Sequence, residues 1–299
     1  TYPDGRQNLA ITANNNPYLI HSLQLSYGTI NWLTKGLFLG YRKVWINPQI
    51  DDLLIDSDMW DIAAQSDTTG RLFRLSGLDF TRAITWQNRV RSTFPLATSL
   101  TLEWAFNGEG SAGIYRNDSL TPVVRLLQGA FTYVNHTYTH ANLDAITYQS
   151  ALNELQLNHN RVTSYLRFSR YNRDSMVQPD ISGMDNPEFF RAAKDFGIKY
   201  VISDTSRPGG ANPTPNAGMY SPHQPSILII PRRPTNLFYN LSTPAEWVSE
   251  YNCFYGPQGI CAGGQFRYWP RNLTYQEILD RESDMMLQYL LKWDIDPLM

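Results

Sequence analysis

The chain has 299 residues, enough for one large domain or two ordinary ones, and 25 Lys+Arg against 27 Asp+Glu give a net charge of −2. This near-balance argues against nucleic acid or an anionic membrane surface as the main partner, because both require a basic stripe. Charged residues make up only 17% and aromatic residues 13%, and no long uncharged apolar run forms a transmembrane helix. The composition favours a globular protein that handles neutral ligands such as sugars.

Strand and helix patterns alternate along most of the chain. We expect strands over 41–50, 99–106, 130–135, 199–203 and 227–231. We expect helices over 78–90, 122–128, 148–166, 186–196 and 274–291, with a further strand beginning in 294–299. A long Pro- and Gly-rich loop covers 206–225. The alternation predicts βα units on a largely parallel sheet or barrel, in one domain over 1–299 with 1–40 as a lead-in.

Cysteines and glycosylation sequons favour a protein outside the cell. Cys253 and Cys261 flank a turn-rich stretch that can bring their Cα atoms within disulfide range, and no further Cys or His nearby indicates a metal site. Four sequons lie at Asn117, Asn135, Asn240 and Asn272. We expect Asn135 to stay unmodified at the end of a buried strand, while Asn240 and Asn272 are available. The sequence therefore predicts a secreted or cell-wall-associated protein, and it leaves the oligomeric state open.

His136 and His140 are the first candidates for a metal site. They follow the strand expected over 130–135, and a pair four residues apart is uncommon by chance in a chain with 5 histidines. If the segment turns helical after the strand, both imidazoles lie on one face and can bind one divalent ion. The alternative is two polar residues that cap a strand end.

Asp51 and Asp52 form a carboxylate pair at the carboxyl end of the strand expected over 41–50. In parallel α/β architectures, functional sites are assembled at this end of the strands. Two histidines and one aspartate make an open metal site, and the neighbouring aspartate can serve as general base toward water.

This pattern resembles the first two motifs of polysaccharide deacetylases of the NodB-homology type. The phrases YRKVWINPQIDDLLI, FTYVNHTYTHANLD and MVQPDISGMDN are similar to those of the fungal galactosaminogalactan deacetylases and related biofilm exopolysaccharide deacetylases. The resemblance runs from about Gly40 to the C-terminus. It implies a distorted (β/α) barrel and a hydrolase that removes N-acetyl groups from a GalNAc-type polysaccharide with a divalent metal, usually zinc. It also implies that Asp51 is the catalytic base and that Asp52, His136 and His140 are the metal ligands.

The later motifs of the resemblance fit this chain less closely. Many family members have an Arg-Pro pair where this chain has Gln178 and Pro179, so the arginine that orients the base is missing there. We expect Pro179 and Asp180 to contact substrate, and Asp204 to join the catalytic network. The alternatives are a turn or cap role for Asp180 and an ordinary loop position for Asp204.

The general acid that protonates the leaving amine is a separate question. His223, the one late histidine, lies between prolines in the long loop, where it is poorly placed for this role. We therefore expect the acid to lie just beyond Met299.

Two other functions compete with deacetylation. A metal-independent glycoside hydrolase would use a carboxylate pair such as Glu103 and Glu109. A non-catalytic carbohydrate-binding module would use aromatic platforms, for which the candidates are Trp86, Trp104, Trp247 and Trp269.

Overall fold

The computed structural model describes residues 2–37, 45–214 and 216–299, and its centre is one seven-stranded sheet. The strands are β1 (Gln49–Leu53), β4 (Glu103–Phe106), β5 (Thr132–Asn135), β6 (Tyr171–Met176), β7 (Tyr200–Asp204), β8 (Met219–Tyr220) and β9 (Leu228–Arg232). They pair in the order β1-β4-β5-β6-β7-β9-β8, and every neighbouring pair is parallel except β8 with β9. A separate hairpin of β2 (Asp56–Asp58) and β3 (Leu72–Arg74) follows β1. The predicted α/β class is confirmed.

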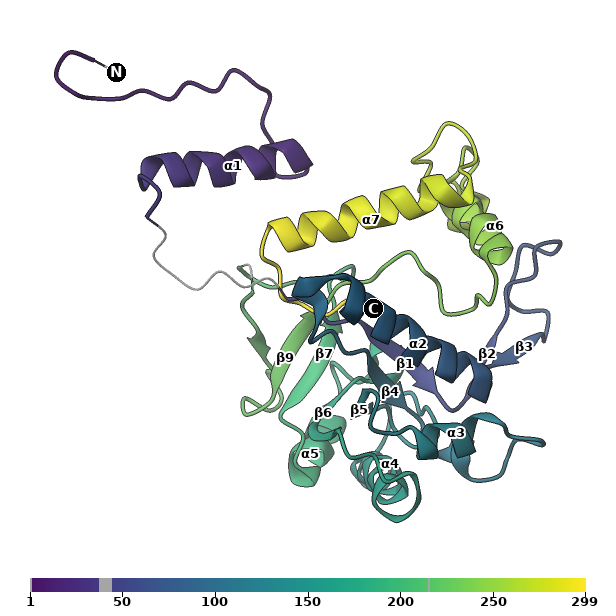
Figure 1. The fold of residues 1–299 in the computed structure, drawn as a ribbon. Coiled ribbons are helices and arrows are strands. Elements are labelled where there is room, and N and C mark those ends of the chain that lie inside the picture. Colours follow the sequence, from purple (N-terminus) through teal and green to yellow (C-terminus); the bar gives the residue numbers. More distant parts are fainter. Residues whose placement is uncertain (1, 38–44, 215) are drawn as a thin grey trace.

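The described ranges contain seven α-helices. They are α1 (Ile20–Leu33), α2 (Gly77–Thr93), α3 (Leu120–Leu126), α4 (Tyr148–Arg161), α5 (Pro187–Phe196), α6 (Pro244–Tyr255) and α7 (Tyr275–Leu291). Of these, α1 lies beside α7, away from the strands (Figure 1). Local signals explain several boundaries: Thr243 and Thr274 form capping boxes at the starts of α6 and α7, and Gly197 ends α5 in the left-handed conformation. None of the helices that the structure describes is both long and apolar enough to cross a bilayer.

The strands separate two cores because successive side chains point to opposite faces. Trp104 and Phe106 of β4 pack in the outer core with Phe80 of α2 and Leu120 of α3. Ala105, between them in sequence, belongs instead to a small inner cluster. The other buried members of this inner cluster are Val134, Val177, Ile181 and Ile202. Helices therefore cover the outside of the strands, and short aliphatic side chains fill the inside.

The sheet curls toward a barrel without closing through its named strands. Residues of β1, β4, β5, β6, β7 and β9 together line an internal cavity of about 190 Å³. Leu298 forms parallel bridges with Pro48, beside β1, and with Arg233, beside β9. The C-terminal residues thus begin the strand that we expected over 294–299. They occupy the gap between the two outer parallel strands.

Several predicted elements lie elsewhere in the structure. Positions 41–44 of the first predicted strand fall outside the described residues, and β1 extends to Leu53, so Asp51 and Asp52 lie within the strand and not after it. The prediction missed the helices α1 and α6 and the strands β2, β3, β6 and β8. The sequence of β6, YNRDSM, is polar because only its last residue is buried, so it lacks the apolar run typical of a parallel strand.

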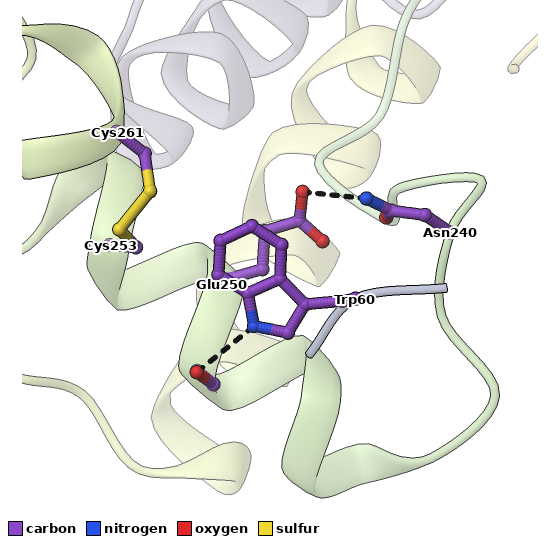
Figure 2. Close-up of a disulfide and its surroundings, with 6 residues drawn as sticks. Trp60, Asn240, Glu250, Cys253 and Cys261 are labelled. Carbon is purple, nitrogen blue, oxygen red and sulfur yellow. Dashed lines mark hydrogen bonds between the residues drawn. A yellow bond between two sulfur atoms is a disulfide. The ribbon is translucent and has the colours of Figure 1, made fainter. Parts of the chain in front are cut away.

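The disulfide and the burial of the four sequon asparagines can be compared directly with the predictions. Cys253 and Cys261 are bonded, with Cα atoms 5.3 Å apart, and Figure 2 shows how this bond ties the following loop to α6. The expectation that Asn240 is available for a glycan is wrong, because it is only 1% exposed and its Nδ2 donates to Glu250 Oε1 at 3.1 Å. Asn135 is buried as expected, whereas Asn117 and Asn272 are exposed.

Candidate metal centre

Three side chains from two strand ends converge on one point. Asp52 lies in β1, and His136 and His140 lie in the loop that directly follows β5. Asp52 Oδ1 is 3.2 Å from His136 Nε2 and 3.2 Å from His140 Nε2. One ligand atom of each residue lies within 4.8 Å of the other two, and no other group of three His, Cys, Asp or Glu side chains does so in the part of the chain that the structure describes.

Left-handed backbone, and not the helix expected after β5, brings the two histidines together. Thr137 and His140 have φ values of 61° and 60°, and Asp52 has a φ of 62°. Non-glycine residues seldom adopt this region, and such strained positions cluster at functional sites. The imidazole centroids are 5.0 Å apart as a result.

The donor set fits a divalent metal. The Nδ1 of the buried His136 donates to the Val177 carbonyl at 2.8 Å, and this contact orients Nε2 toward Asp52. The 3.2 Å between Nε2 and Asp52 Oδ1 lets the two atoms share either a proton or a divalent cation. Two imidazole nitrogens and one carboxylate oxygen make a three-ligand site with open positions for water and substrate.

Charge interactions within this trio shift two pKa values. Burial raises the pKa of Asp52, but hydrogen bonds from His136 and His140 outweigh it, so the pKa lies well below its ordinary value. Burial lowers the pKa of His140, but the hydrogen bond to Asp52 and the nearby charges of Asp180 and Asp51 raise it above its ordinary value. The site therefore holds Asp52 ionised, as a metal ligand requires.

Asp51 does not join the trio but pairs with an arginine that the sequence reasoning missed. Arg232, fully buried at the end of β9, donates from Nη1 to Asp51 Oδ2 at 2.8 Å and from Nη2 to Oδ1 at 2.9 Å. It also donates to the Gln49 carbonyl at 3.3 Å. The bidentate pair fixes the plane of the Asp51 carboxylate beside Asp52, His136 and His140.

Gln178 has a structural role. Its Oε1 accepts from the Ile202 N–H at 2.9 Å and its Nε2 donates to the Ile202 carbonyl at 3.1 Å, so it joins the segment after β6 to β7. Pro179 is buried, and Asp180 is exposed with a φ of 54°, close enough for its charge to act on His140. Asp180 therefore lies at the edge of the site, whereas Pro179 is buried below the surface.

The other sequence candidates are less central. Asp204 pairs with Arg232 in the β7–β9 register, but its carboxylate accepts from the Ser206 N–H at 2.8 Å and contacts Arg207 at 3.3 Å. His223 precedes β9, at the end of the sheet opposite Arg232, and its ring lies 5.8 Å from that of Phe190.

The glutamates of the glycosidase alternative lie at opposite ends of β4. Glu103 begins the strand and accepts a hydrogen bond from Gln49 Nε2 at 2.6 Å, whereas Glu109 follows the end of the strand. Among the tryptophans, Trp104 and Trp247 are buried in hydrophobic cores and Trp86 is 42% exposed on α2. Trp269 is half-buried, with the Arg281 guanidinium 4.9 Å from its ring centroid.

A second layer of polar residues holds the 136–140 loop in place. Glu154 of α4 accepts from the Tyr138 N–H at 2.8 Å and the Thr139 N–H at 2.9 Å. Asn107 donates to the carbonyls of His136 and Thr137. Strand-end asparagines and a helix-face glutamate carry no distinctive spacing, so the sequence offered no signal for this layer.

Comparisons with known proteins agree with this geometry. The family model described as the Agd3 deacetylase domain matches residues 123–299. A search of curated proteins finds no match. Among solved structures, the crystal structure of Agd3, described as a novel carbohydrate deacetylase, has a TM-score of 0.77 at 21% identity, over 93% of this chain and 48% of that chain. This chain thus spans about half the length of that structure.

Two more distant structures are also similar. A family 4 carbohydrate esterase from Streptomyces lividans gives a TM-score of 0.34 at 13% identity, over 56% of this chain and 68% of that chain. The chitin deacetylase from the fungal pathogen Colletotrichum lindemuthianum gives 0.35 at 12% identity, over 85% of this chain and 84% of that chain. These TM-scores are too low to support an argument.

Proposed function

Because the chain belongs to the Agd3 deacetylase domain family, we propose that it is a metal-dependent N-deacetylase acting on N-acetylhexosamine residues of a polysaccharide. The observation that carries the proposal is the convergence of Asp52, His136 and His140, with Asp51 held beside them by Arg232. The family match covers the two histidines and Arg232 but not the two aspartates. The aspartates come from β1, so geometry supplies an argument that the family match does not contain.

The roles of the residues follow from their surroundings. Asp52, His136 and His140 would hold the ion, and we propose zinc because imidazole nitrogen and carboxylate oxygen suit it. The ion, when bound, lowers the pKa of water and polarises an amide carbonyl. Asp51 takes the proton of the attacking water, and Arg232 keeps its carboxylate aimed at that water. Asp180, at the rim, contacts the sugar.

Substrate and location are the finer parts of the proposal. A GalNAc-type exopolysaccharide, such as a biofilm galactosaminogalactan, is the proposed substrate, on the motif resemblance. The Cys253–Cys261 disulfide and the exposed sequons at Asn117 and Asn272 support a secreted or cell-wall-associated glycoprotein.

Acetate release is the direct test. Purified protein is incubated with GalNAc-type and GlcNAc-type polymers, with and without a chelator, and both acetate and new reducing ends are measured. We expect acetate from the GalNAc-type polymer, its loss with chelator, and its return when zinc is restored. Chelator-resistant appearance of reducing ends without acetate would favour the glycoside hydrolase. The absence of both products, with polymer binding retained, would favour a binding module.

A further inference from the structure

An aromatic pocket lies on α6, outside the metal centre and its supporting residues. It has a volume of about 230 Å³ and is lined by Asn236, Tyr251, Tyr255, Phe266 and Tyr268. Tyr251 is 3% exposed, whereas Phe266 and Tyr268 are 41% and 62% exposed. The pocket therefore has a buried floor and walls that present aromatic faces to solvent.

The pocket is held in shape by covalent and stacking contacts. The Cys253–Cys261 disulfide ties α6 to the loop that carries Phe266 and Tyr268. The Tyr268 ring stacks on Tyr255, with centroids 5.6 Å apart and planes 17° apart, so one face of Tyr268 is packed and its other face is open. A stacked, cross-linked platform loses little conformational freedom when a ligand binds.

The polar edge of the pocket is also fixed in advance. Tyr255 donates its hydroxyl to Asn236 Oδ1 at 2.9 Å, and Asn236 Nδ2 donates to Glu282 Oε1 at 2.9 Å. The orientation of the Tyr255 hydroxyl is thereby set, and its oxygen remains able to accept a further hydrogen bond from a ligand hydroxyl. The lining residues that the structure describes include no charged side chain.

These features match a pyranose ring, which has one apolar face and a rim of hydroxyl groups. Aromatic faces accept the apolar face, fixed polar groups accept hydroxyls, and the neutral lining disfavours a charged ligand. We propose that this pocket is a second sugar-binding site that holds a neutral hexosamine unit of the polymer, remote from the reacting unit. The inference rests on the proposed polysaccharide specificity.

The position of α6 favours a second sugar site that is connected to the metal centre. Its Ser249 accepts a hydrogen bond from the Trp60 indole at 3.0 Å, and Trp60 lies on the segment that leaves the metal centre after β1 (Figure 2). The next residues along the same helix, beginning with Tyr251, line the pocket. One helix thus connects the segment that follows the metal centre to the aromatic platform.

The test measures binding without turnover. In the Asp51→Asn background, calorimetry follows a hexamer of GlcNAc and a GalNAc oligomer of similar length. Tyr268→Ala and Phe266→Ala should each weaken binding of at least one oligomer by roughly three- to tenfold, as expected for a lost stacking contact. Tyr268→Phe should retain it. Tyr220→Ala, which removes a tyrosine that is 67% exposed on β8, is the matched control and should change nothing.

Thermal unfolding and zinc content of each variant confirm that the fold is intact. Unchanged affinity in both Tyr268→Ala and Phe266→Ala, or an equal loss in Tyr220→Ala, would overturn the proposal. Acetate release by the parent protein together with unchanged affinities would refute the second site and leave the deacetylase intact. If Tyr268→Ala loses affinity but the parent protein releases no acetate, the second sugar site stands and the proposed deacetylase function is refuted.

Discussion

Arg232 donates hydrogen bonds to both carboxylate oxygens of Asp51, although the two residues are 181 positions apart in the sequence. The arginine side chain is fully buried, whereas the aspartate is 27% exposed, so the pair is open toward the site on the carboxylate side alone. A bidentate contact of this kind restricts the rotation of the acceptor more than a single hydrogen bond does. Arg232 thus orients Asp51 from the end of β9.

Arg232→Lys should therefore slow turnover while the ion stays bound. A lysine keeps the charge but not the planar pair of donors, and misplacing a base costs on the order of 10- to 100-fold in kcat. Steady-state kinetics and metal analysis check this, with Arg233→Lys as the neighbouring control. In an Asp51→Asn background the same substitution should cause no further loss, and an additive loss would show that Arg232 acts elsewhere.

Metal analysis of variants should distinguish the three proposed ligands from the proposed base. His136→Ala and Asp52→Ala should each lose the ion and nearly all activity, because each removes one of three protein ligands. Asp51→Asn should keep the ion and lose turnover, since only the proton acceptor changes. His159→Ala, outside the site, is the control. Full metal occupancy in His136→Ala would refute the ligand assignment.

Glu154 should matter for metal affinity although it does not touch the ion site. Its carboxylate accepts two backbone N–H groups of the loop between the two histidines. Glu154→Ala should weaken zinc binding by roughly tenfold or more, as for other residues that orient metal ligands. Competition with a chromophoric chelator measures this. Gln156→Ala, an exposed position on the same helix, should match the parent, and equal affinities in all three proteins would exclude the role.

The raised pKa of Glu250 predicts that this carboxylate lowers folding stability as pH rises. Burial raises its pKa to about 7, a hydrogen bond from Asn240 opposes this, and the charge of Asp67 adds to it. The folded state then binds more protons than the unfolded state between the ordinary pKa of 4.5 and about 7, so this group lowers stability as pH rises through that window. The slope from one such group reaches at most about 1.4 kcal/mol per pH unit.

Denaturant unfolding of the parent and Glu250→Gln between pH 4.5 and 8 isolates this effect. As pH rises, the unfolding free energy of Glu250→Gln should increase relative to that of the parent, because glutamine stays neutral. Glu246→Gln on the same helix should behave oppositely. Burial raises the pKa of Glu246, but hydrogen bonds from Ser242 and Thr243 outweigh it and lower the pKa below 4.5. The parent therefore loses stability relative to Glu246→Gln as pH falls below about 4.5, and this comparison is followed to lower pH. Parallel curves for parent and Glu250→Gln would contradict the assignment.

The convergence of His136 and His140 was predictable from sequence, but for a reason that the structure does not support. The spacing of His136 and His140 indicated a helix face, whereas a loop with two left-handed residues brings the rings together. Spacing identified the residues because both follow one strand end. The conformation depends on Glu154 and Asn107, which hold the loop from other elements, and a local pattern contains no information about them.

Arg232 escaped prediction for a related reason. It ends a short apolar run and is followed by a second arginine, so the sequence does not show which of the two points inward. The answer depends on the register of β9 against β7 and on its approach to β1 across the curled sheet. The aromatic pocket depends similarly on how α6 packs against a loop, and tyrosines spread along the sequence give no local sign of this packing.

The place of Leu298 between Pro48 and Arg233 has a consequence for biosynthesis. One side of β1 acquires its partner only after the chain has been extended from Pro48 to Leu298. Pairings between distant segments form slowly, and an unpaired strand side can recruit strands from other chains. The nascent polypeptide therefore carries an unpaired strand side, next to its aspartate pair, until Leu298 has been made, and at this strand we expect chaperones to be needed most.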